Sequence, residues 1–401
     1  MLDFDTAQQK LASAASAPQD SVTVALADAN GRVLAQDVLA RLDAPPADNS
    51  AMDGYALRAA DYAEGRGLPV QQRIYAGAAP EPLAPGQAAR LFTGSLLPAG
   101  ADTIAIQEDC NESDGEVFIA CAPQPGQWVR RRGEDVARGA RLLAAGSLIG
   151  PAQIAALASQ GLDALPMFPR LRVGILTTGD ELVAPGQPRA DQQIYNSNGP
   201  MLAALAQNMG AQVPRVLHAR DELGALRAAF EQLIDECDLV ISVGGVSVGE
   251  RDLVKPALHE LGGELDLWKV RMKPGKPLTL SHVRGTPVIG LPGNPVSAYV
   301  VFALMVSPLI RRMQGRAEVF PAIDAGTVST PKPLRDEREE FMRAQSRVNE
   351  RGERQFVLYP QQGSHVISSL PWAHGLVRLP AGTTVNDGDL VRYYDLRHWL
   401  S

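Results

Sequence analysis

Three short segments of the sequence combine glycines with acids or prolines in a pattern that suits anion binding. They read LTTGDE at residues 176–181, VGGVSVGERD at 243–252 and LPGNPVS at 291–297. Each follows or ends an apolar run typical of a buried strand, and parallel sheets bind ligands beyond the carboxyl ends of their strands. Glycines let a ligand approach the backbone, and the first N–H groups of a helix bind anions. A plain turn explains any single segment, but three together favour a binding site.

Lysine is rare in this chain except near these segments. Of 38 basic residues only six are lysines, and four of those six are Lys255, Lys269, Lys273 and Lys276. Lysine offers a compact point charge to an oxyanion, whereas arginine offers a planar fork. The cluster therefore favours an anion site between 255 and 276 over a chance grouping.

Five acids lie in or near the same segments and could converge at the strand ends: Asp180, Glu181, Asp221, Glu250 and Asp252. Carboxylates bind Mg²⁺ while phosphate oxygens complete its coordination shell. Acids followed by lysines therefore suit a ligand made of a metal ion and a phosphate, with surface salt bridges as the alternative. The sequence contains neither a G-x-G-x-x-G dinucleotide fingerprint nor a G-x-x-x-x-G-K-[ST] phosphate loop.

The elements that must position these residues change character along the chain. Residues 5–17 are expected to form a helix, and 21–40 a strand, a turn and a second strand. Short apolar runs cut by Gly and Pro between about 49 and 145 predict a small β-rich domain. From Pro169 onward strands and helices alternate, which predicts an α/β domain with a mainly parallel sheet. After about residue 319 short alternating runs predict a final β domain.

Within the α/β region the individual elements follow from the apolar periodicity. Strands are expected at residues 172–176, 213–217, 238–243 and 287–291, and helices at 200–209, 222–236, 251–261 and 295–310. The longest apolar run, 296–306, is short enough to favour a buried helix over a membrane span, and Pro308 is expected to end it.

Composition excludes several classes of function. A net charge of −7 argues against general binding to nucleic acid or to anionic membranes. The three cysteines, Cys110, Cys121 and Cys237, form no C-x-x-C pair, which argues against a disulfide framework or a structural zinc site. An acidic start without an apolar segment does not resemble a signal peptide, so a reducing, cytoplasmic location is expected.

A second polar group lies in the N-terminal half, and with it the chain resembles a known family. The segments are DNSAMDGY at 48–55, FTGS at 92–95 and RRRGED at 130–135. Together with the TGDE, GGVSVG, KPGKP and LPGNPVS motifs, in this order, they resemble the molybdopterin molybdenumtransferase family, whose relatives include the E domain of gephyrin. The resemblance spans nearly the whole chain, and its full set of motifs is specific.

The resemblance implies a fold of four parts and a late step of molybdenum cofactor synthesis. The reaction inserts molybdate into adenylated molybdopterin and releases AMP with Mg²⁺ as cofactor. A homodimer and contact with molybdopterin adenylyltransferase are also implied. The implied parts are an elongated discontinuous N-terminal domain (1–48 and 136–168), a β-rich insertion (49–135), an α/β molybdopterin-binding domain (169–318) and a C-terminal β-barrel (319–401).

The resemblance also implies roles for residues that match the family's motifs. Catalytic residues contributed by the partner subunit would be Asp53, Thr93 and Asp135. Glu181, Asp221 and Asp252 would polarise the phosphoanhydride, with Glu181 and Asp252 as metal ligands, and Lys269, Lys273 and Lys276 would carry anions. The cofactor-binding residues would be Gly244, Gly245, Ser247, Gly249, Pro292, Gly293, Asn294 and Pro295, with Arg343 and Ser364 holding molybdate.

Two other functions compete with molybdenum insertion. Molybdopterin adenylyltransferase uses the same kind of α/β domain, but it would need neither the flanking domains nor the Asp53 and Asp135 motifs. A non-catalytic scaffold of the gephyrin type would not need the acids and lysines, which are all present. Molybdate and tungstate are so similar in size and charge that the sequence does not distinguish them.

Overall fold

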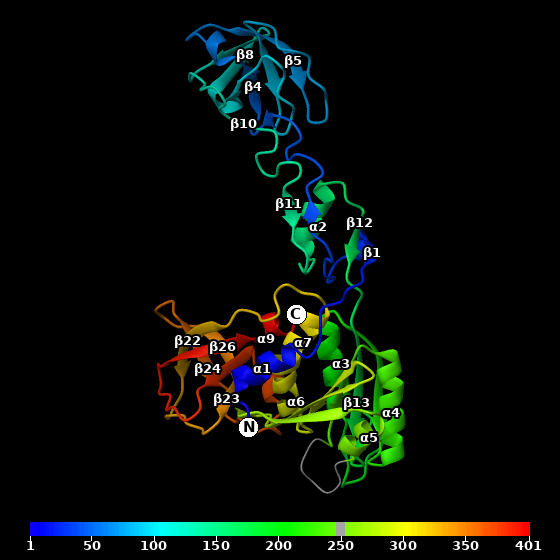
Figure 1. Cartoon of the computed structure of the whole chain (residues 1–401). Helices are drawn as coiled ribbons and strands as arrows, with labels where there is room; N and C mark the ends of the chain where they lie inside the picture. The colour runs from blue at the N-terminus through cyan, green and yellow to red at the C-terminus, as the bar shows by residue number, and fades with distance from the viewer. Residues whose placement is uncertain (246–252) are drawn as a thin grey trace.

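Four regions follow one another in an elongated molecule (Figure 1). The computed structural model describes residues 1–245 and 253–401, and of residues 265–268 the backbone alone. A β-rich unit lies at one end, a slender unit in the middle, and an α/β unit beside a β-barrel at the other end.

The slender unit is built from two separate stretches of chain. Strand β1 (Val22–Ala25) pairs antiparallel with β12 (Ala164–Met167), and β2 (Val38–Leu39) pairs with β11 (Arg141–Leu143). The strand expected after the turn at Asn30 is therefore not a hairpin partner of β1. Its apolar residues pack instead with helix α2 (Pro151–Ser159) in a core that includes Leu34, Leu157 and Leu165.

The β-rich unit is confirmed. Its sheet has the strand order β7-β4-β6-β5-β9-β8, and a short pair, β10 with β3, connects it to the slender unit. Small apolar clusters fill both faces of the sheet, one around Tyr55 and Val117 and one around Ile74 and Leu91. The strands are β3 (Asn49–Ser50), β4 (Gly54–Leu57), β5 (Leu68–Ile74), β6 (Ala88–Leu91), β7 (Thr103–Ile106), β8 (Cys110–Ser113), β9 (Glu116–Ile119) and β10 (Val129–Arg130).

The α/β unit has a six-stranded sheet in the order β16-β13-β17-β21-β20-β18. The first four strands are parallel, whereas β20 runs antiparallel to both of its neighbours. The mainly parallel sheet is thus confirmed, and two strands that the periodicity did not reveal, β18 and β20, flank the lysine segment. The strands are β13 (Arg172–Thr178), β16 (Gln212–Ala219), β17 (Leu239–Val243), β18 (Glu264–Lys269), β20 (Pro277–Val283) and β21 (Thr286–Leu291).

Helices cover both faces of this sheet, as its buried strands require. On one face Leu226, Phe230 and Leu233 of α4 form the apolar stripe that the sequence predicts. The helices are α3 (Asn198–Asn208), α4 (Leu223–Glu236), α5 (Val254–Glu260), α6 (Pro295–Val301) and α7 (Ser307–Met313).

The long apolar helix continues past Pro308, as its expected range of 295–310 requires, although Pro308 ends the apolar run itself. A π-helical segment, Phe302–Val306, joins α6 to α7, so helical structure continues to Met313. Proline has no N–H to donate to the carbonyl one turn earlier in a regular α-helix. The π turn adds one residue just before Pro308 and so accommodates this missing hydrogen bond. The helix Pro295–Met313 is long and apolar enough to cross a membrane, but 83% of its most apolar window is buried inside the protein. Such burial is typical of a core helix in a globular protein.

The C-terminal unit is a closed five-stranded barrel. Strands follow in the order β23-β24-β22-β26-β25, and pairing of β25 with β23 closes the ring. A further short strand, β19 (Met272–Lys273), comes from the lysine segment and pairs in parallel with β23. The barrel strands are β22 (Asp324–Ser329), β23 (Glu339–Val348), β24 (Arg354–Leu358), β25 (Gly375–Leu379) and β26 (Leu390–Asp395), with short helices α8 (Ser369–Trp372) and α9 (Leu396–Trp399).

The N-terminal helix α1 (Phe4–Ala12) does not lie in the slender unit. Phe4 and Leu11 belong to the large core that joins the α/β unit to the barrel, where Phe4 contacts Phe341. Arg378 of the barrel donates to both carboxylate oxygens of Asp5, at 2.7 and 2.8 Å. The first residues of the segment 1–48 therefore pack with the α/β unit, and the helix is shorter than the expected 5–17.

Candidate functional site

A cavity of about 900 Å³ lies at the carboxyl edge of the α/β sheet, where the barrel meets it. The first and the third of the three expected loops line it. Gly244 and Gly245, the described part of the second loop, line it as well. Barrel residues complete the wall: Arg338, Gln362, Gly363 and Ser364. The sheet edge and the barrel together thus form one large cleft with both polar and apolar lining.

The acids Glu181 and Asp221 line this cavity from neighbouring strands. Glu181 follows β13 and Asp221 follows β16, and the hydroxyl of Thr178 donates to the Asp221 carboxylate. The Glu181 carboxylate lies directly against Gly179, where a Cβ would be 2.5 Å from its oxygen. Glycine at 179 is thus required for this position of Glu181, and its φ of +141° also favours glycine.

The described glycines of the second loop also allow close packing. A Cβ on Gly244 would lie 2.7 Å from the carbonyl oxygen of Thr178, and one on Gly245 would lie 2.6 Å from Val254. Both have positive φ angles. The remaining residues expected from this loop, Ser247, Gly249 and Asp252, lie outside the described residues.

The third loop is held in place by a residue that sequence reasoning missed. Asn198, at the start of α3, is 8% exposed and donates from its side-chain amide to the carbonyl of Gly293 at 2.7 Å. Pro292, Gly293, Asn294 and Pro295 all line the cavity, and Pro295 opens helix α6. The only available signal was the polar YNSN sequence just before a predicted helix.

The three expected lysines have three different environments. Lys276 is exposed and lines the cavity, whereas Lys269 is exposed but does not line it. Lys273 lines the cavity and forms ion pairs with Asp336 at 2.9 Å and Glu340 at 3.0 Å. Burial alone would lower the pKa of Lys273, but its hydrogen bonds to these two carboxylates outweigh burial and raise that pKa. Lys273 therefore joins the lysine segment to the barrel.

Replacing Lys273 by methionine is expected to change how stability depends on pH. Burial alone would raise the pKa of Asp336, but hydrogen bonds from Lys273 and from the Arg338 backbone lower it. The stability that this lowered pKa provides is present above the pKa of the unfolded carboxyl and is lost as the pH falls through the folded pKa. Lys273→Met removes one of the hydrogen bonds that lower the pKa of Asp336. The free energy of unfolding should therefore fall less in the variant than in wild type between about pH 5 and pH 3.

Urea unfolding followed by circular dichroism at several pH values measures this difference. Lys332→Met is the matched control, because Lys332 is an exposed lysine of the barrel domain that contains Asp336. If wild type and Lys273→Met lose equal free energy on acidification while the control behaves as wild type, the ion pair does not set this pH dependence.

Arg343, which the resemblance assigns to molybdate, lies beneath the cavity wall. It is 1% exposed, and its guanidinium donates to Ser369 at 3.1 Å and to the carbonyls of Gln361 and Gly363 at 3.3 and 3.1 Å. Burial lowers the pKa of Arg343 to about 10. The loop that it holds contains Ser364, which does line the cavity. The cavity-lining guanidinium of this region belongs instead to Arg338, whose site role the sequence did not indicate.

Replacing Arg343 by leucine is expected to lower the free energy of unfolding by about 3 kcal/mol, because buried carbonyls lose their donors. The loop with Ser364 should lose its position as well, so the KM for molybdate, the substrate that the resemblance implies, should rise. Guanidinium denaturation and initial rates measure the two effects. Arg347→Leu, at an exposed position of the same strand, should show neither. Lost molybdate binding with unchanged stability would instead mean that Arg343 contacts the anion.

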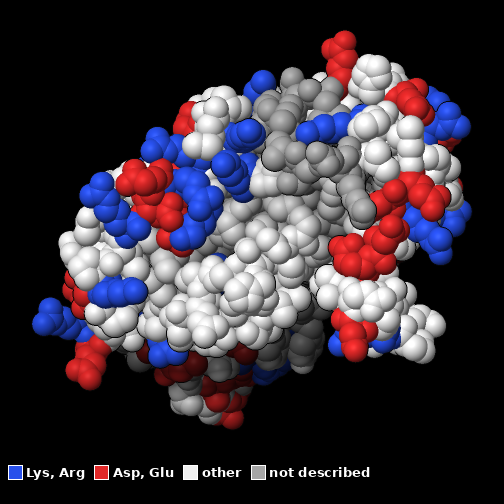
Figure 2. Space-filling view, turned by 90° about the horizontal axis from the view of Figure 1, so that it is seen from below, with Lys and Arg blue, Asp and Glu red and all other residues white. Residues whose placement is uncertain are grey.

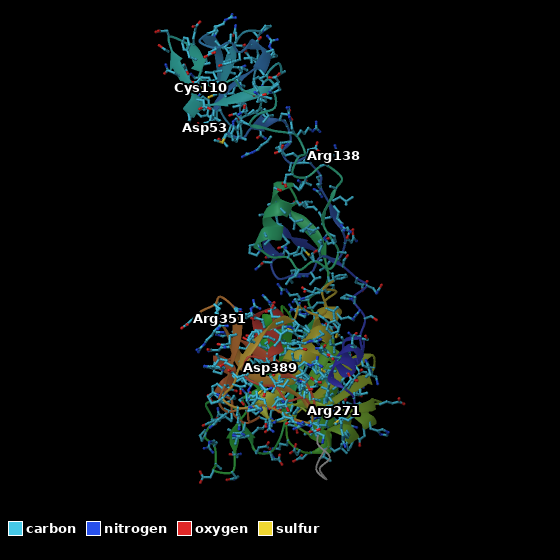
Figure 3. All side chains as sticks on the ribbon, turned by 90° about the vertical axis from the view of Figure 1, so that its left-hand side faces the viewer. Asp53, Cys110, Arg138, Arg271, Arg351 and Asp389 are labelled. Carbon is cyan, nitrogen blue, oxygen red and sulfur yellow. The ribbon has the colours of Figure 1, made fainter. Side chains whose placement is uncertain are left out.

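The N-terminal group of expected site residues lies in the β-rich unit, at the far end of the molecule from the cavity (Figure 1 and Figure 3). Asp53 accepts hydrogen bonds from the backbone N–H and the hydroxyl of Thr93, both at 2.7 Å, and these bonds lower the pKa of Asp53. Asp135 is exposed at the junction with the slender unit. Within one chain, these three residues do not meet the cavity.

Two further observations concern metal ions and charge. Among the described residues no group of three or more His, Cys, Asp or Glu side chains is placed to hold a metal ion by itself. The face seen from below carries clusters of both signs around a broad uncharged area rather than one continuous basic surface (Figure 2). Two acids expected near this site, Glu250 and Asp252, lie outside the described residues.

The fold and the cavity define a class: an α/β enzyme with a large cleft at the strand ends, lined by acidic and basic side chains and flanked by accessory domains. Models for three regions match in order: MoeA N-terminal region (domain I and II) at residues 2–161, probable molybdopterin binding domain at 174–312 and MoeA C-terminal region (domain IV) at 326–396. The chain belongs to the molybdopterin molybdenumtransferase family.

Individual relatives resemble the chain over its whole length. Molybdopterin molybdenumtransferase of Haemophilus influenzae is 35% identical over 100% of both chains. Molybdopterin molybdenumtransferase 2 of Mycobacterium tuberculosis is 37% identical over 94% of this chain and 95% of its own. The crystal structure of the molybdopterin biosynthesis moeA protein from Pyrococcus horikoshii OT3 has a TM-score of 0.83 at 26% identity, covering 98% of this chain and 99% of that one.

Proposed function

We propose that this protein transfers molybdenum from molybdate to adenylated molybdopterin and releases AMP. The names of its relatives state the molybdenum transfer, and the observation that carries the proposal is the order of charged groups along the sheet edge. Asp221 and Glu181 follow β16 and β13, the glycines follow β17, and Lys276 precedes β20. Because β20 runs antiparallel to β21, its start lies at the same edge as the ends of the parallel strands.

The spacing of these groups suits a long ligand with two anionic parts. Four strand-to-strand steps separate β16 from β20 in the sheet, which corresponds to about 19 Å. The acids are thus at one end of the cleft and the basic groups at the other. In the proposed complex the phosphoanhydride lies at the acid end and molybdate at the basic end.

Mg²⁺ fits the acid end of the cleft. Glu181 and Asp221 present two carboxylates to one cavity, and Mg²⁺ is commonly held by one or two carboxylates together with substrate phosphates. Gly179 leaves the space that the Glu181 carboxylate occupies. When bound there, Mg²⁺ supplies positive charge that neutralises the phosphate oxygens as AMP leaves. Asp252 is proposed as a further ligand from the family resemblance.

The other groups bind and orient the two substrates. Lys276 and Arg338 provide positive charge for molybdate, and Ser364 provides a hydroxyl donor. Gly244, Gly245 and the loop from Pro292 to Pro295 leave room for the pterin and its phosphate beside the backbone. These residues hold molybdate close to the dithiolene sulfurs, and proximity of this kind is a large part of the catalysis of a two-substrate reaction.

The proposed active form is a homodimer in the cytoplasm. In one chain the β-rich unit, which carries Asp53 and Thr93, lies at the opposite end of the molecule from the α/β unit (Figure 1), so a second subunit would have to bring them to the cavity. The elongated shape gives the β-rich unit the reach to do so, and twofold symmetry would then complete two equal sites. Transfer of adenylated molybdopterin from a bound molybdopterin adenylyltransferase is part of the proposal.

Measuring AMP release from adenylated molybdopterin with Mg²⁺, with and without molybdate, tests the function. Molybdate-dependent release that yields active molybdenum cofactor is the expected result. AMP release at the same rate with and without molybdate contradicts molybdenum insertion. Consumption of ATP with free molybdopterin would identify an adenylyltransferase, and no turnover with either substrate would favour a scaffold.

A further inference from the structure

Two large apolar side chains are exposed at the rim of the cavity. Ile194 is 56% exposed and Tyr195 is 47% exposed, and both line the cavity together with Leu182. They form β15 (Ile194–Tyr195), which pairs in parallel with β14 (Leu182–Val183). Neighbouring apolar side chains that remain exposed beside a polar cleft are typical of a surface that a ligand covers.

This rim is tied to the loop that carries the acids. The Ile194 N–H donates to the carbonyl of Glu181 at 2.8 Å, and the Asn196 N–H donates to the carbonyl of Val183 at 2.8 Å. The intervening turn is closed by Arg189, which donates to the carbonyl of Gln193 at 2.9 Å. Tyr195 is therefore positioned next to the carboxylate end of the cleft and away from the lysine end.

The order of groups in the substrate decides which part of it reaches this rim. This step rests on the proposed function. The dithiolene must lie beside molybdate at the basic end, and the phosphoanhydride lies at the acids. The adenosine is attached to the outer phosphate, so it extends past the acids, on the side away from the dithiolene.

We infer that Tyr195 and Ile194 form the subsite that binds the adenine ring of the substrate and of the AMP product. Among the described residues that line the cavity, Tyr195 is the only aromatic one. A planar purine gains free energy by stacking on an exposed aromatic ring, and every base offers such a face. Ile194 beside it adds apolar contact. The subsite gives the enzyme a way to favour adenylated over free molybdopterin.

Calorimetric titration of the full-length protein with AMP in the presence of Mg²⁺ tests this subsite. Tyr195→Ala is expected to raise the Kd for AMP about tenfold, equivalent to about 1.4 kcal/mol. Tyr195→Phe keeps the ring and should stay within about twofold of wild type. Leu390→Ala is the control, because Leu390 is 75% exposed on the barrel and does not line the cavity. Equal thermal midpoints show that the variants are folded.

A second ligand separates base stacking from phosphate binding. Ribose 5-phosphate lacks the base, so its Kd should be the same for wild type and Tyr195→Ala. The inference is overturned if wild type shows no AMP binding at millimolar concentration, or if Tyr195→Ala binds AMP as wild type does. It is also overturned if the variant weakens binding of free molybdopterin but not of AMP, since the pterin would then occupy the rim.

This experiment and the test of the proposed function can fail separately. Binding of AMP is measured without molybdate and without turnover. If AMP binds through Tyr195 but the rate of AMP release from the substrate does not depend on molybdate, the adenine subsite is supported and molybdenum insertion is contradicted. If release depends on molybdate but Tyr195→Ala leaves AMP binding unchanged, the function stands and the subsite does not.

Discussion

Replacing Glu181 by glutamine should reduce kcat for molybdate-dependent AMP release by about a hundredfold or more. The amide keeps the shape of the side chain but removes one of the two described carboxylates of the cleft. A metal ion that neutralises developing charge contributes several kcal/mol, and each 1.36 kcal/mol corresponds to a tenfold change in rate. The Mg²⁺ concentration needed for half-maximal rate should rise as well. Initial rates at varied Mg²⁺ measure both effects.

A nearby acid outside the cleft provides the control. Glu222 is exposed and follows Asp221 directly, but it does not line the cavity. Glu222→Gln should keep wild-type kcat and the same Mg²⁺ requirement. Thermal midpoints of both variants should match wild type. If Glu181→Gln retains half of the wild-type rate at low Mg²⁺, Glu181 is neither a metal ligand nor a stabiliser of the leaving group.

Two inactive variants should regain activity when their subunits are mixed. Asp53→Ala removes a residue of the β-rich unit, and Glu181→Gln removes one of the cleft. In the proposed twofold dimer a hybrid has one site with both defects and one site with neither. Equal mixing makes half of the dimers hybrid, so activity should return to about a quarter of the wild-type value. Each variant alone should stay about a hundredfold below wild type.

Mixing two variants of the same unit is the control for this experiment. Glu181→Gln with Lys276→Ala both alter the cleft, so no hybrid contains an intact site, and no activity should return. Light scattering must show dimers before and after exchange. Recovery with the control pair, or none with Asp53→Ala and Glu181→Gln despite demonstrated exchange, would contradict a site shared between subunits.

Asp53 is hydrogen-bonded to a neighbouring residue of its own unit. Its carboxylate accepts two hydrogen bonds from Thr93, which lower its pKa. Asp53 does not line the cleft, and it lies in the β-rich unit at the opposite end of the molecule (Figure 3). The hybrid experiment therefore tests the one feature of the site that a single chain cannot provide.

The sequence by itself was sufficient to predict the α/β domain, the β-rich units and most of the cleft. Buried parallel strands require long apolar runs, and a ligand near the backbone requires glycine, so both features leave clear local patterns. The loops after β13 and β21 line the cavity as expected from such patterns. The strands β18 and β20 were missed, although the lysine segment between them was recognised by its composition.

Only the tertiary structure decided which charges face the ligand. Lys273 and Lys276 are three residues apart, yet one is paired with Asp336 and Glu340 while the other is exposed in the cleft. Arg343 and Arg338 are likewise separated by five positions on the chain, and the structure buries the first and places the second on the cavity wall. The residues that contact Lys273 and Arg343 are distant from them in sequence, so no local sequence pattern predicts the contacts.

The positions of whole elements were also decided by contacts between distant segments. Helix α1 packs against the barrel because Asp5 accepts hydrogen bonds from Arg378 and Phe4 contacts Phe341. Both partners are hundreds of positions away in the sequence. The long helix passes Pro308 because a π turn absorbs the mismatch inside a fully buried core. Local patterns in the sequence therefore predicted which segments line the cleft, and long-range packing determined which of their side chains reach it.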